Sequence, residues 1–306
     1  MSRKKSSHRF RRTLLWLLTL LVLGGMWGFL SHGTPPTAEE LEGHPHRLKV
    51  LTWNTARVGN FKKPAENEVL HYLMQQDADV ICLQEVDVYK NARFLTLQEV
   101  KDVLSSKYRY SYIDFSQYNS YRQFGTMVWS NYPLINKHSI HYETQGNLSN
   151  RCDIVVGDDT LRLINNHLES YCFTPDDLAD VDSLHNYEGL RASLKRLEEK
   201  RKRATPLRNA QARVIHEEVK QSPYPVLVVG DFNAIPLSYA YWRIRYGLHD
   251  AWTQTSWGRY GATCVHRHVG VRIDYILCSD PLIPLACDIP QAPGSDHKPV
   301  IATIAW

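Results

Sequence analysis

The chain has 306 residues, and 43% of them are hydrophobic, which is enough for one large globular domain or two small ones. Its formal net charge is +4, yet six basic residues and no acid stand within residues 1–12, and the rest carries 30 basic against 32 acidic residues. A body without a basic surplus argues against a protein that grips long nucleic acid through many phosphate contacts. Catalysis on phosphate esters stays open.

An uncharged apolar run at 13–30 follows the basic tail. A helix of this length spans roughly 27 Å, close to the thickness of a bilayer's hydrocarbon core. We therefore predict a single-pass transmembrane signal-anchor, with 1–12 as a cytoplasmic tail and the body on the periplasmic or extracytoplasmic side. The alternative is a cleavable signal peptide, which the length of the run and the lack of a small-x-small cleavage site disfavour. Both readings export the body.

Residues 31–47 carry Pro, Gly, His and acids without periodicity, so they are predicted to be a linker, and 48–306 are predicted to form one folded domain. In an exported domain the six cysteines make disulfides possible. Cys82 and Cys278 lie in apolar strand-like runs and are predicted to be buried thiols. Cys152 and Cys172 flank a strand and its exit loop and could pair, although the sequence leaves the pairing open.

Short β-type runs recur along the body, and each one leads into, or contains, a polar residue of a catalytic type. The runs at 49–53, 80–84, 161–166 and 226–230 lead into Asn54, Glu85, His167 and Asp231, Asp274 lies inside the run at 271–277, and Asp296 and His297 precede the run at 299–306. Helical patterns lie between them, near 64–77, 92–106 and 184–220. Strands that alternate with helices predict an α/β fold with helices packed outside the sheets.

Carboxylates at two of these strand ends suggest a metal site, because Mg²⁺ prefers hard oxygen ligands, with a substrate phosphate completing its shell. Glu85 is the first candidate, although a lone acid after a strand is more often a solvated turn residue. The segment GDFNAIP is more specific. Asp231 and Asn233, two apart on an extended backbone, point to the same side and can jointly hold a water, a metal or a phosphate oxygen. The alternative is an Asx turn after the strand.

The triplet Ser295-Asp296-His297 places a carboxylate beside an imidazole immediately before the last strand. A histidine that titrates near neutral pH needs a partner that fixes its tautomer, and Asp274 could supply it. A core salt bridge without chemistry is the alternative for Asp274. A zinc site on the alternating Cys264-x-His-x-His pattern is disfavoured, because three ligands so close on one strand rarely close a tetrahedral site.

Six short motifs occur in order along the body: WN at 53–54, QE at 84–85, NHL at 166–168, GDFN at 230–233, RIDYI at 272–276 and SDH at 295–297. Together they resemble the signature of the endonuclease/exonuclease/phosphatase (DNase I-like) superfamily. That superfamily includes DNase I-like nucleases, apurinic endonucleases, inositol polyphosphate 5-phosphatases and neutral sphingomyelinases. The resemblance covers roughly 48–306 and implies a four-layer α/β sandwich, in which two facing mixed sheets are flanked by helices and the site lies at the strand ends.

The resemblance also implies roles for individual residues. Glu85 resembles the principal metal ligand, with Asn54 and Asp296 nearby in the shell of an Mg²⁺ ion, for which Mn²⁺ is an accepted substitute. No covalent enzyme intermediate is implied.

The reacting groups follow from the same resemblance. Asp231 resembles the residue that positions or deprotonates the attacking water, and Asn233 the residue that binds a phosphate oxygen. His297, oriented by Asp274, and His167 resemble the two histidines that contact the phosphate.

We therefore expect a membrane-anchored, Mg²⁺-dependent phosphodiesterase, a hydrolase of nuclease-like type that acts by in-line attack of water on phosphorus. The alternatives are a lipid or small-molecule phosphodiesterase or phosphatase of sphingomyelinase type, and a non-catalytic, membrane-tethered binding module. Arg122, beside a tyrosine-rich stretch, is a weaker candidate for substrate binding. The expected partners are a phosphoester substrate (nucleic acid or phospholipid) and the membrane, and no protein partner is predicted.

Overall fold

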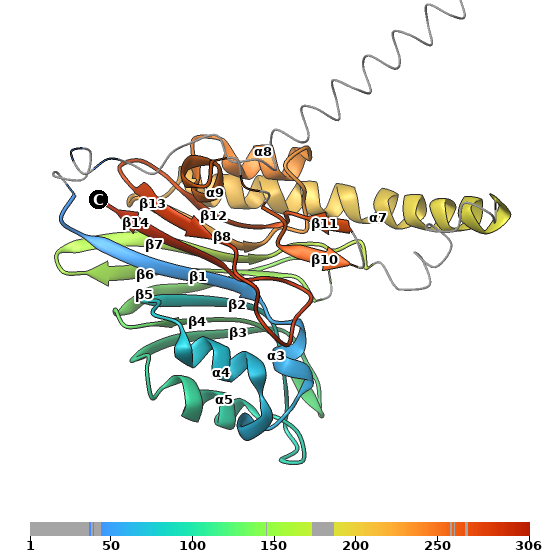
Figure 1. Ribbon diagram of the computed structural model, residues 1–306, viewed down its shortest axis with the longest axis horizontal. Helices are drawn as coiled ribbons and strands as arrows, with labels where there is room; N and C mark the ends of the chain where they lie inside the picture. Colours follow the sequence, from blue (N-terminus) through green and yellow to red (C-terminus); the bar gives the residue numbers. More distant parts are fainter. Residues whose placement is uncertain are drawn as a thin grey trace, which may run out of the picture.

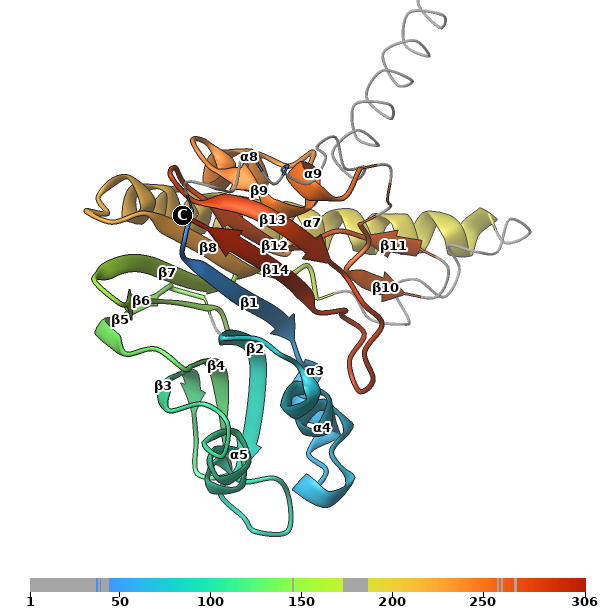
Figure 2. The same cartoon turned by 60° about the vertical axis from the view of Figure 1, so that its left-hand side comes forward.

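The computed structural model describes residues 37, 39, 44–144, 146–172, 187–257, 259, 261–266 and 269–306. Two six-stranded sheets lie face to face, with helices on their outer sides (Figures 1 and 2). The α/β sandwich predicted from the sequence is therefore observed. The predicted anchor at 13–30 lies outside the described residues, and among those that are described no helix is long and apolar enough to cross a bilayer.

The first sheet contains the two amino-terminal strands of the domain and its last strand. Its order is β13 (Ile283–Asp288), β14 (Val300–Ala305), β1 (Arg47–Asn54), β2 (Val80–Tyr89), β4 (Arg122–Ser130) and β3 (Tyr110–Tyr118). β1 and β2 are parallel, and the other pairs are antiparallel. His46 and Trp306 exchange two backbone hydrogen bonds at 3.2 Å, which extend the β1–β14 pair and bring the two ends of the domain together.

The second sheet has the order β5 (Leu134–His141), β6 (Leu148–Val156), β7 (Asp159–His167), β8 (Val226–Asp231), β12 (Asp274–Cys278) and β9 (His249–Asp250). β7 and β8 are parallel. A separate two-stranded ribbon is formed by β10 (Cys264–His266) and β11 (Val269–Val271). Each sheet thus has one parallel pair of strands at its centre. The carboxyl ends of both pairs lie at the same end of the sandwich (Figure 2).

Helices cover both outer faces (Figure 1). The first sheet carries α3 (Ala56–Asn60), the 3₁₀ turn η1 (Pro64–Glu66), α4 (Glu68–Gln75) and α5 (Leu97–Leu104). The second sheet carries α7 (Tyr187–Lys220) and α8 (Tyr239–Arg245), with α9 (Ala251–Thr255) near its edge. The pattern near 92–106 yields the shorter helix α5, because Thr96 forms a capping box with Glu99 and thereby fixes the first turn.

Three apolar clusters fill the three gaps between the layers. Successive residues of a strand point to opposite faces, so Val50 and Val229 pack between the sheets while Leu51 packs against α4 and Val228 packs under α7 and α8. A strand covered on both faces is apolar at most of its positions. This explains why the central strands read as unbroken apolar runs.

Two local expectations are wrong. β2 does not end before Glu85 but continues to Tyr89, and Asp274 is the first residue of β12 rather than lying within it. The suggested pairing of Cys152 with Cys172 is also not observed, because all six cysteines are free, with Cys152 buried and Cys172 exposed. Cys82 and Cys278 are buried thiols, as predicted.

Candidate active site

The inward faces of the central strands change from apolar to polar at the same end of the sandwich. On β1 the inward series passes from Val50 to Thr52 and Asn54, and on β7 it passes from Leu163 to Asn165 and His167. Because β1 and β2 are parallel to each other, as are β7 and β8, their carboxyl ends bring these polar residues together. The site is therefore a polar continuation of the core.

A buried hydrogen-bonded layer separates this site from the apolar core. Gln84 Nε2 donates to Asn165 Oδ1 at 2.7 Å and to Thr52 Oγ1 at 2.9 Å, which links the two sheets directly. Asn150 Nδ2 donates to Thr126 Oγ1 at 2.9 Å in the same layer. These hydrogen bonds between the sheets help to fix their separation and register, while Gln84 Oε1 and Asn150 Oδ1 have no partner among the described residues.

Glu85 faces the site because β2 is irregular at this point. The β2–β4 register shifts between Leu83 and Val86, and Glu85 has a φ of 51°. Asn54 Nδ2 donates to Glu85 Oε1 at 3.1 Å and to Asp231 Oδ2 at 2.9 Å, so one amide joins the two carboxylates. Burial raises the pKa of Glu85, but the neighbouring His167 and Asn54 outweigh it and bring the pKa to about 2. Glu85 is a carboxylate at neutral pH.

Asp231 and Asn233 form the Asx turn that was the alternative reading of this segment. The Asn233 backbone N–H donates to Asp231 Oδ1 at 2.7 Å, and Asn233 has a φ of 50° rather than an extended conformation. Its side chain still points to the site, since Nδ2 lies 3.2 Å from Asp231 Oδ2. Burial and the charge of Asp274 raise the pKa of Asp231 above its ordinary value, which makes this carboxylate a better proton acceptor.

His297 is held by neighbours from three segments. Its Nδ1 lies 2.9 Å from Asp274 Oδ2, and its backbone carbonyl accepts from Trp53 Nε1 at 2.9 Å. Asp274 is fixed in turn, because Thr263 Oγ1 accepts from its backbone N–H at 3.1 Å. Burial lowers the pKa of His297, yet the Asp274 carboxylate more than offsets this and raises it well above 6.5. Nε2 of His297 lies 4.0 Å from Asp231 Oδ2.

His167, the last residue of β7, lies opposite Glu85, with Nε2 3.5 Å from Glu85 Oε1. Burial lowers its pKa, but the interaction with Glu85 dominates and the pKa is raised. Within the described part of the chain, neither ring nitrogen has a hydrogen-bond partner, although the side chain is only 6% exposed. A buried imidazole without a hydrogen-bond partner, with one carboxylate 3.5 Å from its Nε2, is arranged to meet a ligand.

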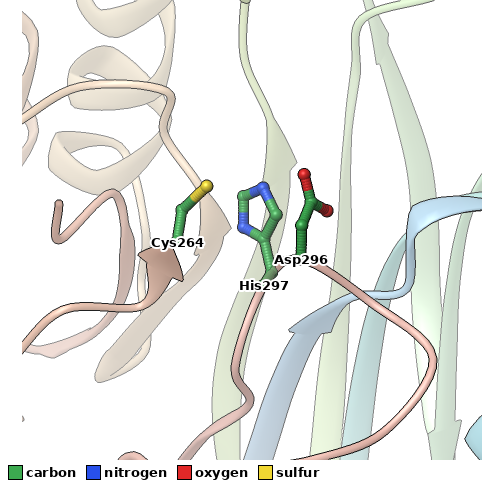
Figure 3. Close-up of side chains that lie close together, drawn as sticks. All are labelled: Cys264, Asp296 and His297. Atoms are coloured by element: carbon green, nitrogen blue, oxygen red, sulfur yellow. The ribbon is translucent and has the colours of Figure 1, made fainter. Parts of the chain in front are cut away.

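Two predicted residues stand apart from this group. Asp296 is exposed and groups with Cys264 and His297, whose ligand atoms lie within 4.8 Å of one another, rather than with Glu85 (Figure 3). Arg122 Nη1 lies 3.1 Å from Asp87 Oδ2. The backbone of Arg122 pairs with Tyr89 at the end of β2, four residues beyond Glu85. The side chain of Arg122 is 39% exposed, so it lies at the edge of the site.

Sequence reasoning missed Trp53 as a support of His297 and Cys264 as its neighbour. Cys264 forms an isolated β-bridge with His297, which the alternating Cys-x-His-x-His pattern around it did not indicate. A long-range bridge of this kind leaves no local signal in the sequence.

The donor atoms of the site fit a hard divalent cation. Carboxylate oxygens of Glu85 and Asp231 both face the Asn54 amide, and oxygen ligands are those that Mg²⁺ and Mn²⁺ take. Asn54 presents Nδ2 to both acids, so ligation through its Oδ1 requires the amide to rotate. Two acids, two amides and two imidazoles thus lie close together, a set suited to placing water beside a phosphate group.

We compared the sequence and the fold with those of known proteins. The sequence profile described as "Endonuclease/Exonuclease/phosphatase family" matches residues 51–297. A search of curated protein sequences found no match.

Solved structures share the fold at low sequence identity. An endonuclease/exonuclease/phosphatase from Beutenbergia cavernae is 16% identical, with a TM-score of 0.59 over 85% of this chain and 72% of its own. Truncated Caenorhabditis elegans TDP2 is 20% identical, with a TM-score of 0.59 over 87% of this chain and 100% of its own. Sphingomyelinase C from Streptomyces griseocarneus is 18% identical, with a TM-score of 0.52 over 84% of this chain and 99% of its own.

Proposed function

Because this chain belongs to the endonuclease/exonuclease/phosphatase family, we propose that it is a metal-dependent phosphodiesterase that hydrolyses its substrate by direct attack of water on phosphorus. The observation that carries the proposal is the convergence of Glu85, Asn54 and Asp231 beside His167 and His297 at one end of the sandwich. Carboxylates and imidazoles lie within about 4 Å of each other, as a reaction that moves a proton and builds negative charge requires.

Mg²⁺ is the metal proposed for this site, with Mn²⁺ as a substitute. Glu85 and Asn54 would hold it, whereas Asp296 lies with Cys264 and His297 and is not assigned to this ion. When bound, the ion supplies Lewis acidity to a phosphate oxygen. The low pKa of Glu85 supports this role, because the carboxylate needs no deprotonation before it binds a cation.

The side chains of the site have separate roles in the reaction. Asp231 orients the water and accepts its proton as the water oxygen bonds to phosphorus and the ester P–O bond breaks in line. The Asn233 amide binds a phosphate oxygen. His297 and His167 contact the phosphate and offset the negative charge that builds on its oxygens.

The first test is hydrolysis of bis-(p-nitrophenyl) phosphate by the full-length chain and by Asp231→Asn. We expect the variant to lose about 10²–10⁴-fold in kcat, the range for removal of a general base. The control is Asp159→Asn, which changes an acid at the opposite end of β7 and should leave kcat unchanged. EDTA should abolish the wild-type rate and added Mg²⁺ should restore it. Equal rates for Asp231→Asn and the wild type would contradict the assignment.

Two substrate classes have specific support. The Phe124 ring lies 6.1 Å from the His167 ring, and an aromatic face beside the phosphate site can stack on a nucleobase, which supports a nuclease. The body carries 30 basic against 32 acidic residues and follows an apolar run, which supports a lipid or small phosphodiester. Parallel assays on single-stranded DNA, RNA, sphingomyelin and phosphoinositides separate them, with Phe124→Leu expected to weaken nucleic-acid cleavage selectively.

Residues 13–30 are proposed to anchor the enzyme in a membrane as a single span, with residues 1–12 in the cytoplasm and the catalytic domain on the extracytoplasmic side. The uncharged run and the six basic residues before it support this orientation.

A further inference from the structure

Cys264, Asp296 and His297 form a second group of ligand atoms beside the proposed active site (Figure 3). One thiol, one carboxylate oxygen and one imidazole nitrogen lie within 4.8 Å of one another. The backbone fixes this proximity, because Val265 N–H donates to the Asp296 carbonyl at 3.2 Å and Lys298 N–H donates to the Thr263 carbonyl at 2.6 Å. The group is therefore built by antiparallel pairing of the β10 segment with the segment before β14.

The donor types of this group differ from those around Glu85. Thiolate and imidazole are softer ligands than carboxylate and amide oxygens, and they select zinc over magnesium. A tetrahedral zinc ion with bonds of about 2.0–2.3 Å keeps its donor atoms roughly 3.3–3.8 Å apart. Atoms within 4.8 Å reach that spacing through small side-chain rotations, which are available because Asp296 is exposed and Cys264 is half-buried.

The histidine is already oriented for a metal. Asp274 Oδ2 lies 2.9 Å from His297 Nδ1, so Nε2 is the nitrogen left for a ligand. A carboxylate that holds the far nitrogen of a histidine is the usual support of a zinc-bound imidazole. In Figure 3, the Cys264 sulfur and the Asp296 carboxylate lie on either side of the His297 ring.

We propose that Cys264, Asp296 and His297 form a zinc site that inhibits the enzyme, with water as the fourth ligand. The inhibition rests on the proposed function, whereas zinc binding does not. Zinc on His297 Nε2 occupies the nitrogen that faces the phosphate, so zinc and substrate compete for this side chain. Mg²⁺ does not bind at this group, because it binds thiolates poorly.

Binding is tested first, with Co²⁺ as a spectroscopic stand-in for zinc and the full-length chain in buffer free of chelators and thiols. We expect a thiolate-to-cobalt charge-transfer band that added Zn²⁺ removes. Cys264→Ser should abolish the band, and Asp296→Asn should weaken cobalt binding by at least about tenfold. The matched control is Cys172→Ser, which removes the exposed cysteine and should keep the band. A wild type without the band, or a band that survives in Cys264→Ser, overturns the site.

Inhibition is tested second, by Zn²⁺ titration of the Mg²⁺-dependent rate. Cys264→Ser keeps the size of the side chain and should retain the uninhibited rate while half-inhibition moves to at least about tenfold higher Zn²⁺. Equal inhibition of Cys264→Ser and wild type would show that zinc acts elsewhere and would overturn the inhibitory role. An inactive wild type would defeat the proposed phosphodiesterase instead, and the cobalt band would still decide whether the site binds metal.

Discussion

Asp274 accepts from His297 Nδ1 at 2.9 Å and is the main reason that the pKa of His297 is raised despite its burial. Two roles follow for one carboxylate: it fixes the orientation of the imidazole, and it raises the pKa of the ring. Neither role needs contact with substrate. Asp274 is therefore a positioning residue, and its effect can be separated from that of His297 by a pH profile.

We expect Asp274→Asn to lower kcat by about 10–100-fold, the usual effect of removing a carboxylate that supports a functional histidine. Removing the carboxylate also lowers the pKa of His297, so the imidazolium is lost at a lower pH than in the wild type. The alkaline limb of the kcat profile should accordingly move toward lower pH. A profile that falls uniformly, without a shift of this limb, would mean that Asp274 acts on something other than the protonation of His297.

At the scale of elements, the site depends on how closely β7 and β8 approach each other. Gly230 has a φ of +117°, and a Cβ there would lie 2.2 Å from the Asn166 carbonyl oxygen. Only glycine allows this backbone conformation and this approach. Because Gly230 precedes Asp231 directly, the same contact sets the position of the proposed general base.

Gly230→Ala should therefore destabilise the fold by more than the strain of a left-handed alanine, which is about 1–2 kcal/mol. Gly157→Ala is the matched control, since Gly157 has a φ of +62° and a Cβ added there would meet nothing within 4 Å, so this variant should show that strain alone. Urea unfolding measures both. Equal losses for the two variants would show that β7 and β8 can separate at no cost.

At the scale of the whole molecule, the membrane span proposed for residues 13–30 makes a testable prediction for the full chain. We expect the full chain to stay in the membrane pellet after alkaline carbonate extraction. Arginine at both Leu18 and Leu21 should release it, because a charge near the centre of a span costs about 2.5–3.5 kcal/mol. Mature protein that begins after residue 30, detected by mass spectrometry, would indicate a cleaved signal peptide instead.

How much of the fold could be predicted also depends on packing across the whole molecule. The six strands that carry motifs were predicted because both of their faces are covered, which makes them continuous apolar runs. β5 was not predicted, since four consecutive residues in its interior are exposed and the run LINKHSIH has no strand pattern. Edge strands of this kind are defined by pairing with a neighbour, as β5 is by β6, rather than by their own composition.

The sequence by itself determined the chemistry: which acids, amides and histidines stand at strand ends, and in what order along the chain. Only the tertiary structure decided which of them meet. Asn54 and Asp231 lie 177 residues apart and are joined at 2.9 Å, while Asp296 lies with Cys264 instead of Glu85. The physical reason is that strand composition follows from local burial, whereas register, bulges and bridges between distant segments depend on partners that no local stretch of sequence contains.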